Sequence, residues 1–365
     1  MKKIGIDCRL INQTGVGTYI KNLLYYLQEI EKKEFYFFVY LLKKDFNLIN
    51  FRKKNFLKKV ADFKWHSFNE QIGYYHFLIN EELDLMHFTY FSYPILYQKP
   101  FVATIHDVTP LKFKTGLAST KNALIYELKH LAFRYILKNQ LIKAQKIITP
   151  THSVANELIK IYGERYKRKI IPVYEGVSYE LIKNKEKKVN VENLKPFFIY
   201  VGNFYPHKNV DKLIKAFKLL KKIKHNLILI GPDDYFKKKL FNKIKQLELE
   251  DKIIFYHPQE IGELVYFYKN ATALINPSLS EGFGLPLVEA AYFNCPIIAS
   301  KIPVFKELFG NNYLTFDPYQ VDDIADKINH FLRKKMKFNY QNIIKKFSFR
   351  EMAKKTLGIY KNVLE

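Results

Sequence analysis

The sequence is poor in the features that stabilise small secreted proteins or span membranes. It has only two cysteines in 365 residues, Cys8 and Cys295. Their separation fits neither a disulfide framework nor a metal-binding spacing, which favours a reducing cytoplasm. The longest apolar run, residues 35–42, is far shorter than the roughly 20 residues that cross a bilayer. The first residues, MKKIGIDC, are expected to enter a strand directly instead of forming a signal peptide.

Acidic residues are scarce relative to basic ones. The chain has 60 Lys and Arg against 35 Asp and Glu, a formal net charge of +25. Such a charge attracts nucleic acid and anionic membranes. It is spread over both halves of the chain, and no zinc-finger spacing or RNA-binding aromatic string accompanies it, so we do not expect a nucleic-acid partner. Two interpretations stay open, a compositional bias toward lysine and a functional basic face.

Hydrophobic residues make up 48% of the chain, enough for the cores of two domains. Short apolar segments alternate with helical patterns, which predicts parallel sheets with helices on both faces. The first series of expected strands lies at 3–9, 35–42, 85–88, 102–106, 146–150 and 170–174, with a long helix at 122–143. The second series lies at 197–202, 227–231, 253–256, 272–276 and 296–299.

Between the two series, residues 182–196 are charged and weakly patterned, which predicts a linker. We therefore expect an N-terminal domain over residues 1–185 and a C-terminal domain over residues 186–345. Both should be α/β and doubly wound in the manner of Rossmann folds, facing a cleft that holds the ligand site. A final helix over residues 346–365 is expected to pack back toward the N-terminal domain.

The most informative stretch is SLSEGFGLPLVEA, residues 278–290, which follows a short apolar strand. Its proline suits the first turn of a helix. The loop before that turn lies over a helix N-terminus, where free N–H groups favour an anion such as phosphate. Gly282 and Gly284 permit close approach to the backbone, and Glu289, one turn into the helix, can reach the paired hydroxyls of a ribose. The alternative is an ordinary glycine-rich turn whose glutamates are favoured by the helix dipole.

Three other loops follow expected strands. Gly15 and Gly17 open the first helix and form half of a dinucleotide-binding fingerprint, although a tight packing turn would explain them equally well. His106 stands beside an aspartate at the end of a strand, and we favour a role in a site over that of a core histidine. Lys208 precedes a helix start, where it could neutralise a diphosphate, although it is one lysine among many.

The motifs occur in the order GVGTYI, TIHDVTP, IPVYEGV, YVGNFYPHKN, LILIGP, SEGFGLPLVEA and FDP. Over nearly its whole length the chain resembles the family 4 retaining glycosyltransferases of the GT-B fold, with their E-x7-E signature. It is most similar to the mannosyltransferase-like branch that builds bacterial lipopolysaccharide and O-antigen chains. The resemblance implies transfer of a sugar, expected to be mannose from GDP-mannose, to a glycan or lipid-linked acceptor. It implies no metal ion and no cofactor besides the nucleotide-sugar co-substrate, and a cytoplasmic enzyme that contacts the inner face of an anionic membrane peripherally.

The resemblance implies that the N-terminal domain, 1–185, binds the acceptor and that the C-terminal domain, 186–345, binds the nucleotide sugar. It also assigns roles to individual residues. His106, Lys208 and Glu281 are the expected catalytic residues, with His106 at the transferred sugar and Lys208 at the diphosphate. Glu289 is expected to bind the donor ribose. The remaining donor-binding residues implied by the motifs are Gly15, Gly17, Asn203, Gly282, Phe283, Gly284 and Leu285.

Two positions depart from the family's pattern. Asn203 stands where many relatives have an arginine that shares the diphosphate, which weakens the expected phosphate site. Glu175 precedes Gly176 where an asparagine is usual, which puts any role of that turn in doubt. No carboxylate of the motifs is a convincing nucleophile, so we expect front-face substitution, in which the leaving phosphate helps to deprotonate the incoming hydroxyl. The adjacent pairs at 233–234 and 322–323 are interpreted as turn and helix-start residues, not as metal ligands.

Two other functions of the same architecture stay open, a nucleotide-sugar epimerase and a non-catalytic basic binding protein. A separate hypothesis concerns the membrane. Basic clusters at 52–54, 58–59 and 165–169, together with the aromatic-rich segment 63–97, predict docking on anionic lipid. The alternative is that these aromatic side chains form the core and the lysines a solvated face.

Overall fold

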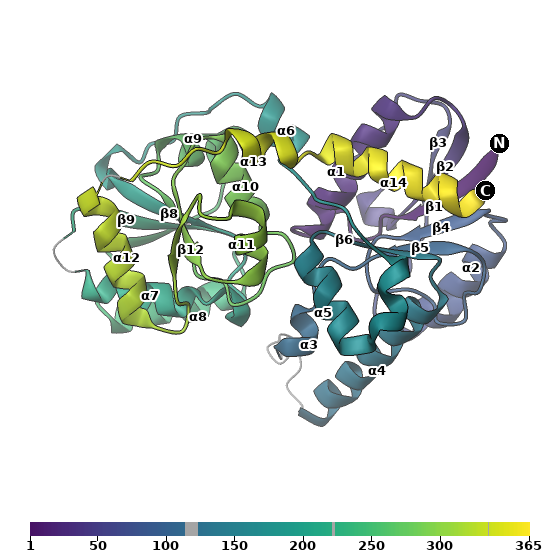
Figure 1. Cartoon of the computed structure of the whole chain (residues 1–365), viewed down its shortest axis with the longest axis horizontal. Helices are drawn as coiled ribbons and strands as arrows, with labels where there is room; N and C mark the ends of the chain where they lie inside the picture. Colours follow the sequence, from purple (N-terminus) through teal and green to yellow (C-terminus); the bar gives the residue numbers. More distant parts are fainter. Residues whose placement is uncertain (114–122, 221–222, 335) are drawn as a thin grey trace. The chain divides into compact units, whose positions relative to one another are not determined.

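A computed structural model of the chain describes residues 1–113, 123–220, 223–334 and 336–365. The chain forms two compact units. Unit 1 comprises residues 1–175 and 348–365, and unit 2 comprises residues 176–347. Each unit has its own parallel sheet (Figure 1). The expected start of the long helix, Asn122, lies outside the described residues.

The described residues of unit 1 form a seven-stranded parallel sheet in the order β3-β2-β1-β4-β5-β6-β7. The strands are β1 (Lys2–Asp7), β2 (Phe35–Leu41), β3 (Phe56–Val60), β4 (Leu85–Phe88), β5 (Phe101–Thr104), β6 (Lys146–Thr149) and β7 (Ile170–Pro172). All six expected strands of this half are present. Strand β3 was not predicted because it is an edge strand whose two lysines interrupt the apolar pattern.

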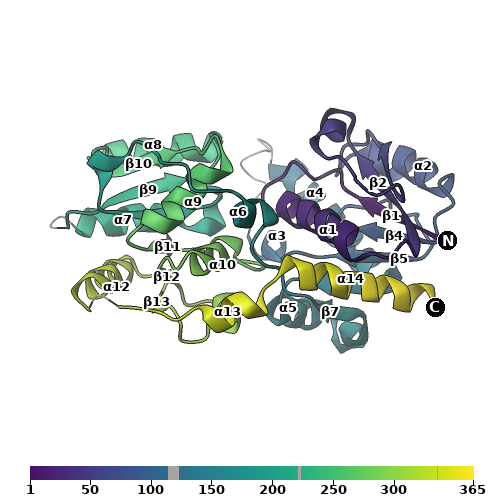
Figure 2. The ribbon, with the colours of Figure 1, turned by 90° about the horizontal axis from the view of Figure 1, so that it is seen from above.

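Helices pack on the sheet of unit 1. They are α1 (Val16–Ile30), α2 (Tyr75–Ile79), α3 (Thr109–Lys112), α4 (Ala123–Lys143), α5 (His152–Tyr162) and α14 (Phe349–Leu364), with shorter turns η1 (Lys43–Leu48), η2 (Glu70–Tyr74) and η4 (Glu164–Lys169). Helix α1 buries Ile20, Leu23, Leu24 and Leu27, one face at helical spacing. The last helix, α14, lies alongside α1 in both views (Figures 1 and 2), so the C-terminal segment belongs to unit 1.

A buried histidine joins α14 to the sheet. His87 on β4 has its Nδ1 2.6 Å from Tyr360 Oη of α14 and its Nε2 2.8 Å from Thr104 Oγ1 of β5. Burial lowers the pKa of His87 to about 3, because a charged ring is poorly solvated there. The neutral ring has one N–H and one acceptor nitrogen, and each hydroxyl can serve either one. Both ring nitrogens are therefore satisfied only when α14 is docked on unit 1.

The described residues of unit 2 form a six-stranded parallel sheet in the order β10-β9-β8-β11-β12-β13. The strands are β8 (Phe197–Val201), β9 (Asn226–Ile230), β10 (Ile253–Tyr256), β11 (Leu274–Asn276), β12 (Ile297–Ser300) and β13 (Leu314–Phe316). The five expected strands are present. The sixth, β13, has only three residues and lies at the edge of the sheet, too short to be recognised by its pattern.

The helices of unit 2 lie on both faces of its sheet (Figure 2). They are α6 (Tyr179–Lys183), α7 (Val210–Leu219), α8 (Tyr235–Gln246), α9 (Ile261–Asn270), α10 (Leu285–Tyr292), α11 (Pro303–Phe309), α12 (Val321–Lys334) and α13 (Gln341–Lys346), with short turns η5 (Glu192–Leu194) and η6 (Pro206–Lys208). Helix α12 packs against α7, and α13 against α10. Alternation of strand and helix with both faces covered is the doubly wound arrangement expected from the sequence.

The expected linker, residues 182–196, is part of unit 2, and the prediction of a boundary at residue 185 was wrong. The units divide between residues 175 and 176. Within this stretch Val189 and Val191 are buried, and the Lys187 N–H donates to the Gly262 carbonyl at 2.9 Å. Its many charged side chains face solvent while its backbone and two valines pack, so composition alone suggested a linker.

The aromatic-rich segment between Phe63 and Tyr97 contributes mainly to the core of unit 1. Tyr74, Phe88, Phe91 and Tyr93 are buried there, as the core alternative predicts for these rings. Alternating aromatic residues in a strand-and-turn segment fill a core as readily as they cover a surface. Among the residues that the structure describes, no helix combines the length and apolar character needed to cross a membrane.

The bridge through His87 gives a prediction for stability. Replacing Tyr360 with phenylalanine removes the hydroxyl and leaves the buried Nδ1 of His87 without a partner. The free energy of unfolding should fall by about 1–3 kcal/mol, measured by denaturant titration. The matched control is Tyr135→Phe, which removes the hydroxyl of a tyrosine that is 62% exposed on α4. Equal stabilities of the two variants would contradict the role given to the bridge.

Candidate functional site

The strand order of unit 2 reverses between β8 and β11, the position at which doubly wound sheets bind ligands. The loop after β8 carries Lys208 and the loop after β11 carries Glu281. Their side chains meet, with Lys208 Nζ 2.7 Å from Glu281 Oε1. The same oxygen accepts a hydrogen bond from Ser278 Oγ at 2.8 Å. The lysine is 17% and the glutamate 10% exposed, so the pair is shielded without being closed off from solvent.

The backbone around this ion pair is clamped by Asn209, the residue after Lys208. Its side-chain amide donates to the Pro277 carbonyl at 3.1 Å and to the Pro318 carbonyl at 2.8 Å. These contacts join the loops that follow β8, β11 and β13. Asn209 has φ +59°, a left-handed conformation that asparagine tolerates better than most residues. Asn209 ends the motif YVGNFYPHKN, and the sequence alone gave no indication of this role.

Helix α10 begins at the loop that contains Glu281. Its N-cap, Gly284, has φ +90°, and a Cβ there would lie 2.7 Å from the Phe305 ring, so the position requires glycine. Gly282 has no positive φ and does not share that requirement. Phe283 is buried with its ring edge-on to Phe347, which leaves only its backbone available to a ligand. Leu285 is the first residue of the helix.

Glu289 lies one turn into α10 and is buried. Its Oε2 accepts a hydrogen bond from Tyr268 Oη of α9 at 2.6 Å. Burial raises the pKa of Glu289 to about 7, with the tyrosine hydrogen bond acting in the opposite direction. Such a shift is typical of functional carboxyl groups. The sequence gave no signal for Tyr268, one of 27 tyrosines, because it comes from a different helix.

Asn203 follows β8, at the position where the resemblance led us to expect an arginine. Its side-chain oxygen accepts a long hydrogen bond, 3.5 Å, from the Tyr205 N–H, and its backbone carbonyl accepts one from Tyr200 Oη. Unit 2 contains a single arginine, Arg333, which lies in the last turn of α12. Unit 2 therefore has no second arginine that could take the place of the one expected at Asn203. The cation next to Glu281 is Lys208.

In unit 1, His106 follows β5 and is buried with defined partners. Its Nε2 lies 2.9 Å from the Thr89 carbonyl and its Nδ1 3.4 Å from Glu175 Oε1. Its ring stands edge-on to Tyr19, with centroids 4.8 Å apart. Both ring nitrogens face acceptors. Glu175, which departs from the family's pattern, is thus the partner of His106, a contact that spacing along the chain could not show.

The two glycines that open α1 differ in their surroundings. Gly15 is the N-cap, with φ +54° and open space where a Cβ would project. A Cβ on Gly17 would lie 2.3 Å from the Ile11 carbonyl oxygen. Close backbone packing therefore accounts for Gly17. At Gly15 the positive φ favours glycine, and the space where a side chain would project is open.

The acidic pairs serve as helix-start residues, as expected. Asp234 caps α8 by accepting hydrogen bonds from the Phe236 and Lys237 N–H groups at 2.9 and 3.0 Å. Asp323, in the first turn of α12, accepts one from the Asp317 N–H at 2.7 Å. Across the described part of the chain, no three His, Cys, Asp or Glu side chains are grouped so that they could hold a metal ion.

The chain matches two family models placed end to end. Residues 14–181 match Glycosyltransferase Family 4, and residues 182–349 match Glycosyl transferases group 1. Among curated proteins it is 29% identical to the O-antigen chain mannosyltransferase RfbU of Salmonella typhimurium over 266 residues, 70% of this chain and 69% of that one. It is 26% identical to the uncharacterized glycosyltransferase MJ1178 of Methanocaldococcus jannaschii, over 96% of this chain and 95% of that one.

Solved structures give the same architecture. Sucrose-phosphate synthase from Thermosynechococcus elongatus superposes with a TM-score of 0.77 at 15% identity, covering 100% of this chain and 99% of that chain. Anabaena Alr3699/HepE, solved in complex with UDP and glucose, superposes with a TM-score of 0.73 at 17% identity, covering 99% and 100%. At such identities the likeness concerns the fold alone, and together with the two Rossmann-like sheets it confirms the expected GT-B fold.

The raised pKa of Glu289 predicts a pH dependence of stability. An ordinary glutamate releases its proton near pH 4.5, whereas Glu289 retains it in the folded protein to about pH 7. The folded state then binds the extra proton, so this stabilisation is fully present below pH 4.5 and is lost as the pH rises to about 7. Its contribution to the free energy of unfolding should fall by about 3 kcal/mol over that interval.

Chemical denaturation of the wild type and Glu289→Gln between pH 4.5 and 7.5 measures this contribution. The glutamine cannot ionise, so the difference in stability between the two proteins should change across the interval. Glu250→Gln, at an exposed glutamate, is the control and should follow the wild type. Parallel pH profiles of the wild type and Glu289→Gln would show that Glu289 has an ordinary pKa.

Proposed function

Because the chain belongs to family 4 of the glycosyltransferases, we propose that it transfers mannose from GDP-mannose, with retention of anomeric configuration. The acceptor is a glycan or a lipid-linked saccharide in the synthesis of a bacterial cell-surface polysaccharide. The proposal is carried by one observation, the meeting of Lys208 and Glu281 at the strand-order reversal of unit 2, beside the N-terminus of α10. A cation, free helix N–H groups and a carboxylate are what a sugar diphosphate needs.

In this assignment Lys208 and the first N–H groups of α10 bind the diphosphate, and Glu281 holds hydroxyls of the transferred sugar. Lys208 is paired with Glu281, and the diphosphate replaces that carboxylate as the partner of the ammonium. Glu289 accepts hydrogen bonds from the ribose hydroxyls, and Tyr268 orients its carboxyl group. Asn203, Gly282, Phe283, Gly284 and Leu285 contribute backbone and shape to the donor site.

The reaction we propose is a substitution on one face of the sugar. The bond from the anomeric carbon to the diphosphate oxygen breaks, and a bond from that carbon to the acceptor oxygen forms. The acceptor's hydroxyl proton passes to the departing diphosphate. Glu281 is bound by Ser278 and Glu289 by Tyr268, which supports assigning neither as a nucleophile. Lys208 stabilises the charge that grows on the leaving group, and His106 contacts the transferred sugar.

We propose further that the enzyme needs no metal ion and no other cofactor. In many nucleotide-sugar enzymes acidic residues hold a divalent cation that neutralises the diphosphate. Here the adjacent acidic pairs cap helices and order turns, and the ammonium of Lys208 together with the α10 N-terminus can supply the compensating charge. We expect the enzyme to keep its activity after exhaustive treatment with a chelator. Loss of activity in the chelator, fully reversed by added Mg²⁺ or Mn²⁺, would contradict this proposal.

Mannose is favoured by the relative RfbU, an O-antigen chain mannosyltransferase. HepE, whose fold is similar, was solved with UDP and glucose, which makes UDP-glucose the natural competing donor. Thermal denaturation with GDP, UDP and ADP tests the nucleotide, because a ligand that binds the folded state alone raises the melting temperature. We expect GDP to give the largest rise, and a larger rise with UDP would overturn the assignment of GDP-mannose.

The other two functions predict different behaviour with the donor. An epimerase converts GDP-mannose without an acceptor, and a binding protein leaves it unchanged under all conditions. A glycosyltransferase forms a new glycosidic product only when an acceptor is present. Incubation of the purified protein with GDP-mannose, with and without acceptor, therefore separates them, and the anomeric configuration of the product tests retention.

A cytoplasmic location with peripheral contact to the inner membrane face is also proposed. With the aromatic core residues excluded, the support comes from exposed apolar side chains of unit 1, Phe68, Ile72 and Leu96, and from the net charge of +25. Sedimentation with vesicles should show binding to anionic lipid that weakens with salt. Phe68→Ser should reduce it, and equal binding to neutral vesicles would reject the electrostatic part.

Lys208 gives a kinetic prediction. Charge on the diphosphate grows in the transition state, so Lys208→Ala should lower kcat by about 100-fold while raising the donor KM by less than about tenfold. Lys334→Ala, which removes an exposed lysine at the end of α12, is the matched control. A Lys208→Ala enzyme with normal kcat and a high donor KM would show that the lysine binds ground state and transition state equally.

A further inference from the structure

The imidazole of His106 is anchored at one of its nitrogens by the backbone that follows β4. Its Nε2 lies 2.9 Å from the Thr89 carbonyl. A carbonyl oxygen only accepts hydrogen bonds, so Nε2 is the donor. Thr89 is itself held in place, because its Oγ1 donates to the Asp7 carbonyl at 2.5 Å. The anchor of His106 thus depends on how firmly the end of β1 is fixed.

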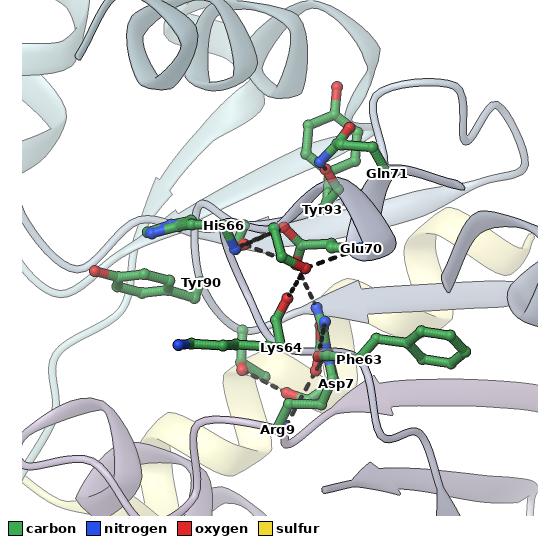
Figure 3. A network of polar contacts seen from close by, with 12 residues as sticks. Asp7, Arg9, Phe63, Lys64, His66, Glu70, Gln71, Tyr90 and Tyr93 are labelled. Carbon is green, nitrogen blue, oxygen red and sulfur yellow. Dashed lines mark hydrogen bonds and ion pairs between the residues drawn. The ribbon is translucent and has the colours of Figure 1, made fainter. Parts of the chain in front are cut away.

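A cluster of buried charges fixes the end of β1 (Figure 3). Arg9 is fully buried, with Nη2 2.7 Å from Asp7 Oδ2 and 2.8 Å from Glu70 Oε1. Ser92 Oγ lies 2.7 Å from both oxygens of Glu70. Separating such a pair would leave buried charges uncompensated, so the cluster resists rearrangement. The carbonyl that accepts from His106 is therefore a fixed point.

The same cluster also holds the loop that follows β3. Arg9 Nη1 donates to the Phe63 carbonyl at 2.8 Å, and Glu70 Oε2 accepts from the His66 N–H at 3.0 Å. Segments that are distant in sequence are thus held against one buried set of charges, which adds to the rigidity of the anchor.

One hydrogen bond does not fix the plane of an imidazole, because the ring can still turn about it. At Nδ1 of His106, Glu175 Oε1 lies 3.4 Å away, longer than a typical N–H···O bond of about 2.7–3.2 Å. The ring of Tyr19 is closer than that of Tyr90, with centroids 4.8 and 6.5 Å from the imidazole. Tyr19 stands at 79° to the imidazole, an edge-on arrangement that aromatic rings favour. It is thus placed to fix the plane of the ring.

Tyr19 is held in turn by a chain of buried polar contacts that reaches the last helix. Its Oη lies 3.1 Å from Thr104 Oγ1, at the end of β5. The same Oγ1 lies 2.8 Å from His87 Nε2, and His87 Nδ1 lies 2.6 Å from Tyr360 Oη of α14. All four side chains are buried. We call Tyr19, Thr104, His87 and Tyr360 the Thr104 chain.

The Thr104 chain is satisfied only when its members stay in place. A threonine hydroxyl has one O–H and two lone pairs, so Thr104 can donate to one neighbour and accept from the other. Burial raises the pKa of Tyr19, so its hydroxyl keeps its proton and its ability to donate. Loss of the Thr104 hydroxyl would remove the partner of His87 Nε2 and a contact that orients the Tyr19 ring.

We propose that Tyr19 and Thr104 are positioning residues for His106, and that α14 takes part in this positioning through Tyr360. The inference rests on the proposed function, in which His106 contacts the transferred sugar. A group that acts on a substrate must be held to within about 0.5 Å and 10–20° of its productive geometry. With Nε2 anchored at a fixed carbonyl, the contact with Tyr19 decides whether the imidazole meets that requirement.

Nuclear magnetic resonance of protein with ¹⁵N-labelled histidine reports on His106 without turnover. The chain has 10 histidines, and the variant His106→Gln identifies the signals of this ring. Because Tyr19 stands edge-on to it, the ring current of the tyrosine affects the signals of the imidazole protons. A change in the relative position of the two rings therefore changes these signals.

The decisive variant is Thr104→Val, which keeps the shape of the side chain and removes its hydroxyl. Thr104→Ser, which keeps the hydroxyl, is the conservative replacement. The matched control is Thr149→Val on the neighbouring strand β6. It removes another buried threonine hydroxyl, which donates to the Thr151 carbonyl at 3.1 Å and lies outside the Thr104 chain.

We expect Thr104→Val to shift the His106 signals and to lower kcat by about tenfold or more, with the donor KM changed by less than about threefold. Thr104→Ser should retain the signals and kcat of the wild type. Thr149→Val should lose stability in denaturant titration but retain both. Tyr360→Phe should also shift the His106 signals, whereas Tyr135→Phe, at an exposed tyrosine, should not.

The proposal is overturned if Thr104→Val leaves the His106 signals unchanged, or if Thr149→Val moves them equally. If Thr104→Val does not fold, Tyr19→Phe removes the other hydroxyl of the same contact and is judged by the same criteria. Shifted signals with an unchanged kcat would also overturn the positioning role, while the proposed function would stand. Shifted signals in a protein whose wild type transfers no sugar would instead reject the proposed function and retain the control of His106 by the Thr104 chain.

Discussion

Both units depend on one constraint, that the strands of a parallel sheet all end at the same edge. Where the strand order reverses, the two loops that leave neighbouring central strands turn to opposite faces and leave their first residues side by side. In unit 2 this constraint brings Lys208 and Glu281 together across 73 positions of sequence. In unit 1 the same constraint brings the residues after β1 and β4 together. It thereby positions Arg9 with its partners Asp7, Glu70 and Ser92, and it positions His106. Loop chemistry differs between the units, but its location is the same.

The charged residues at these edges are held by partners, because a buried charge is costly unless it is paired and hydrogen-bonded. Glu281 is bound by Lys208 and Ser278, Glu70 by Arg9 and Ser92, and His106 faces Glu175. Two kinds of pair result. The pair at Arg9 is fully buried and stabilises loop structure, whereas the pair at Lys208 retains some exposure and can exchange with a ligand. Exposure thus separates the structural ion pair from the one that we propose binds a diphosphate.

Much of the fold could be predicted from sequence. Buried parallel strands are short apolar runs, and alternation with helical patterns is a local property that a single sequence displays. The misses were the edge strands β3 and β13 and the stretch 182–196, whose packing involves a few residues within a polar or charged segment. The motif residues were identified by type and position, but their partners were not. Tyr268, Asn209 and Glu175 have no local feature that distinguishes them from other residues of their kind.

The sequence by itself determined the two α/β units, the loops at the ends of their strands, and the glycine and helix N-terminus at Gly284, because each depends on residues close together in the chain. Only the tertiary structure decided which charges meet, which aromatic rings are core, and that Glu289 is buried against Tyr268 with a raised pKa. The physical reason is that burial and electrostatic coupling depend on distances between segments far apart in sequence.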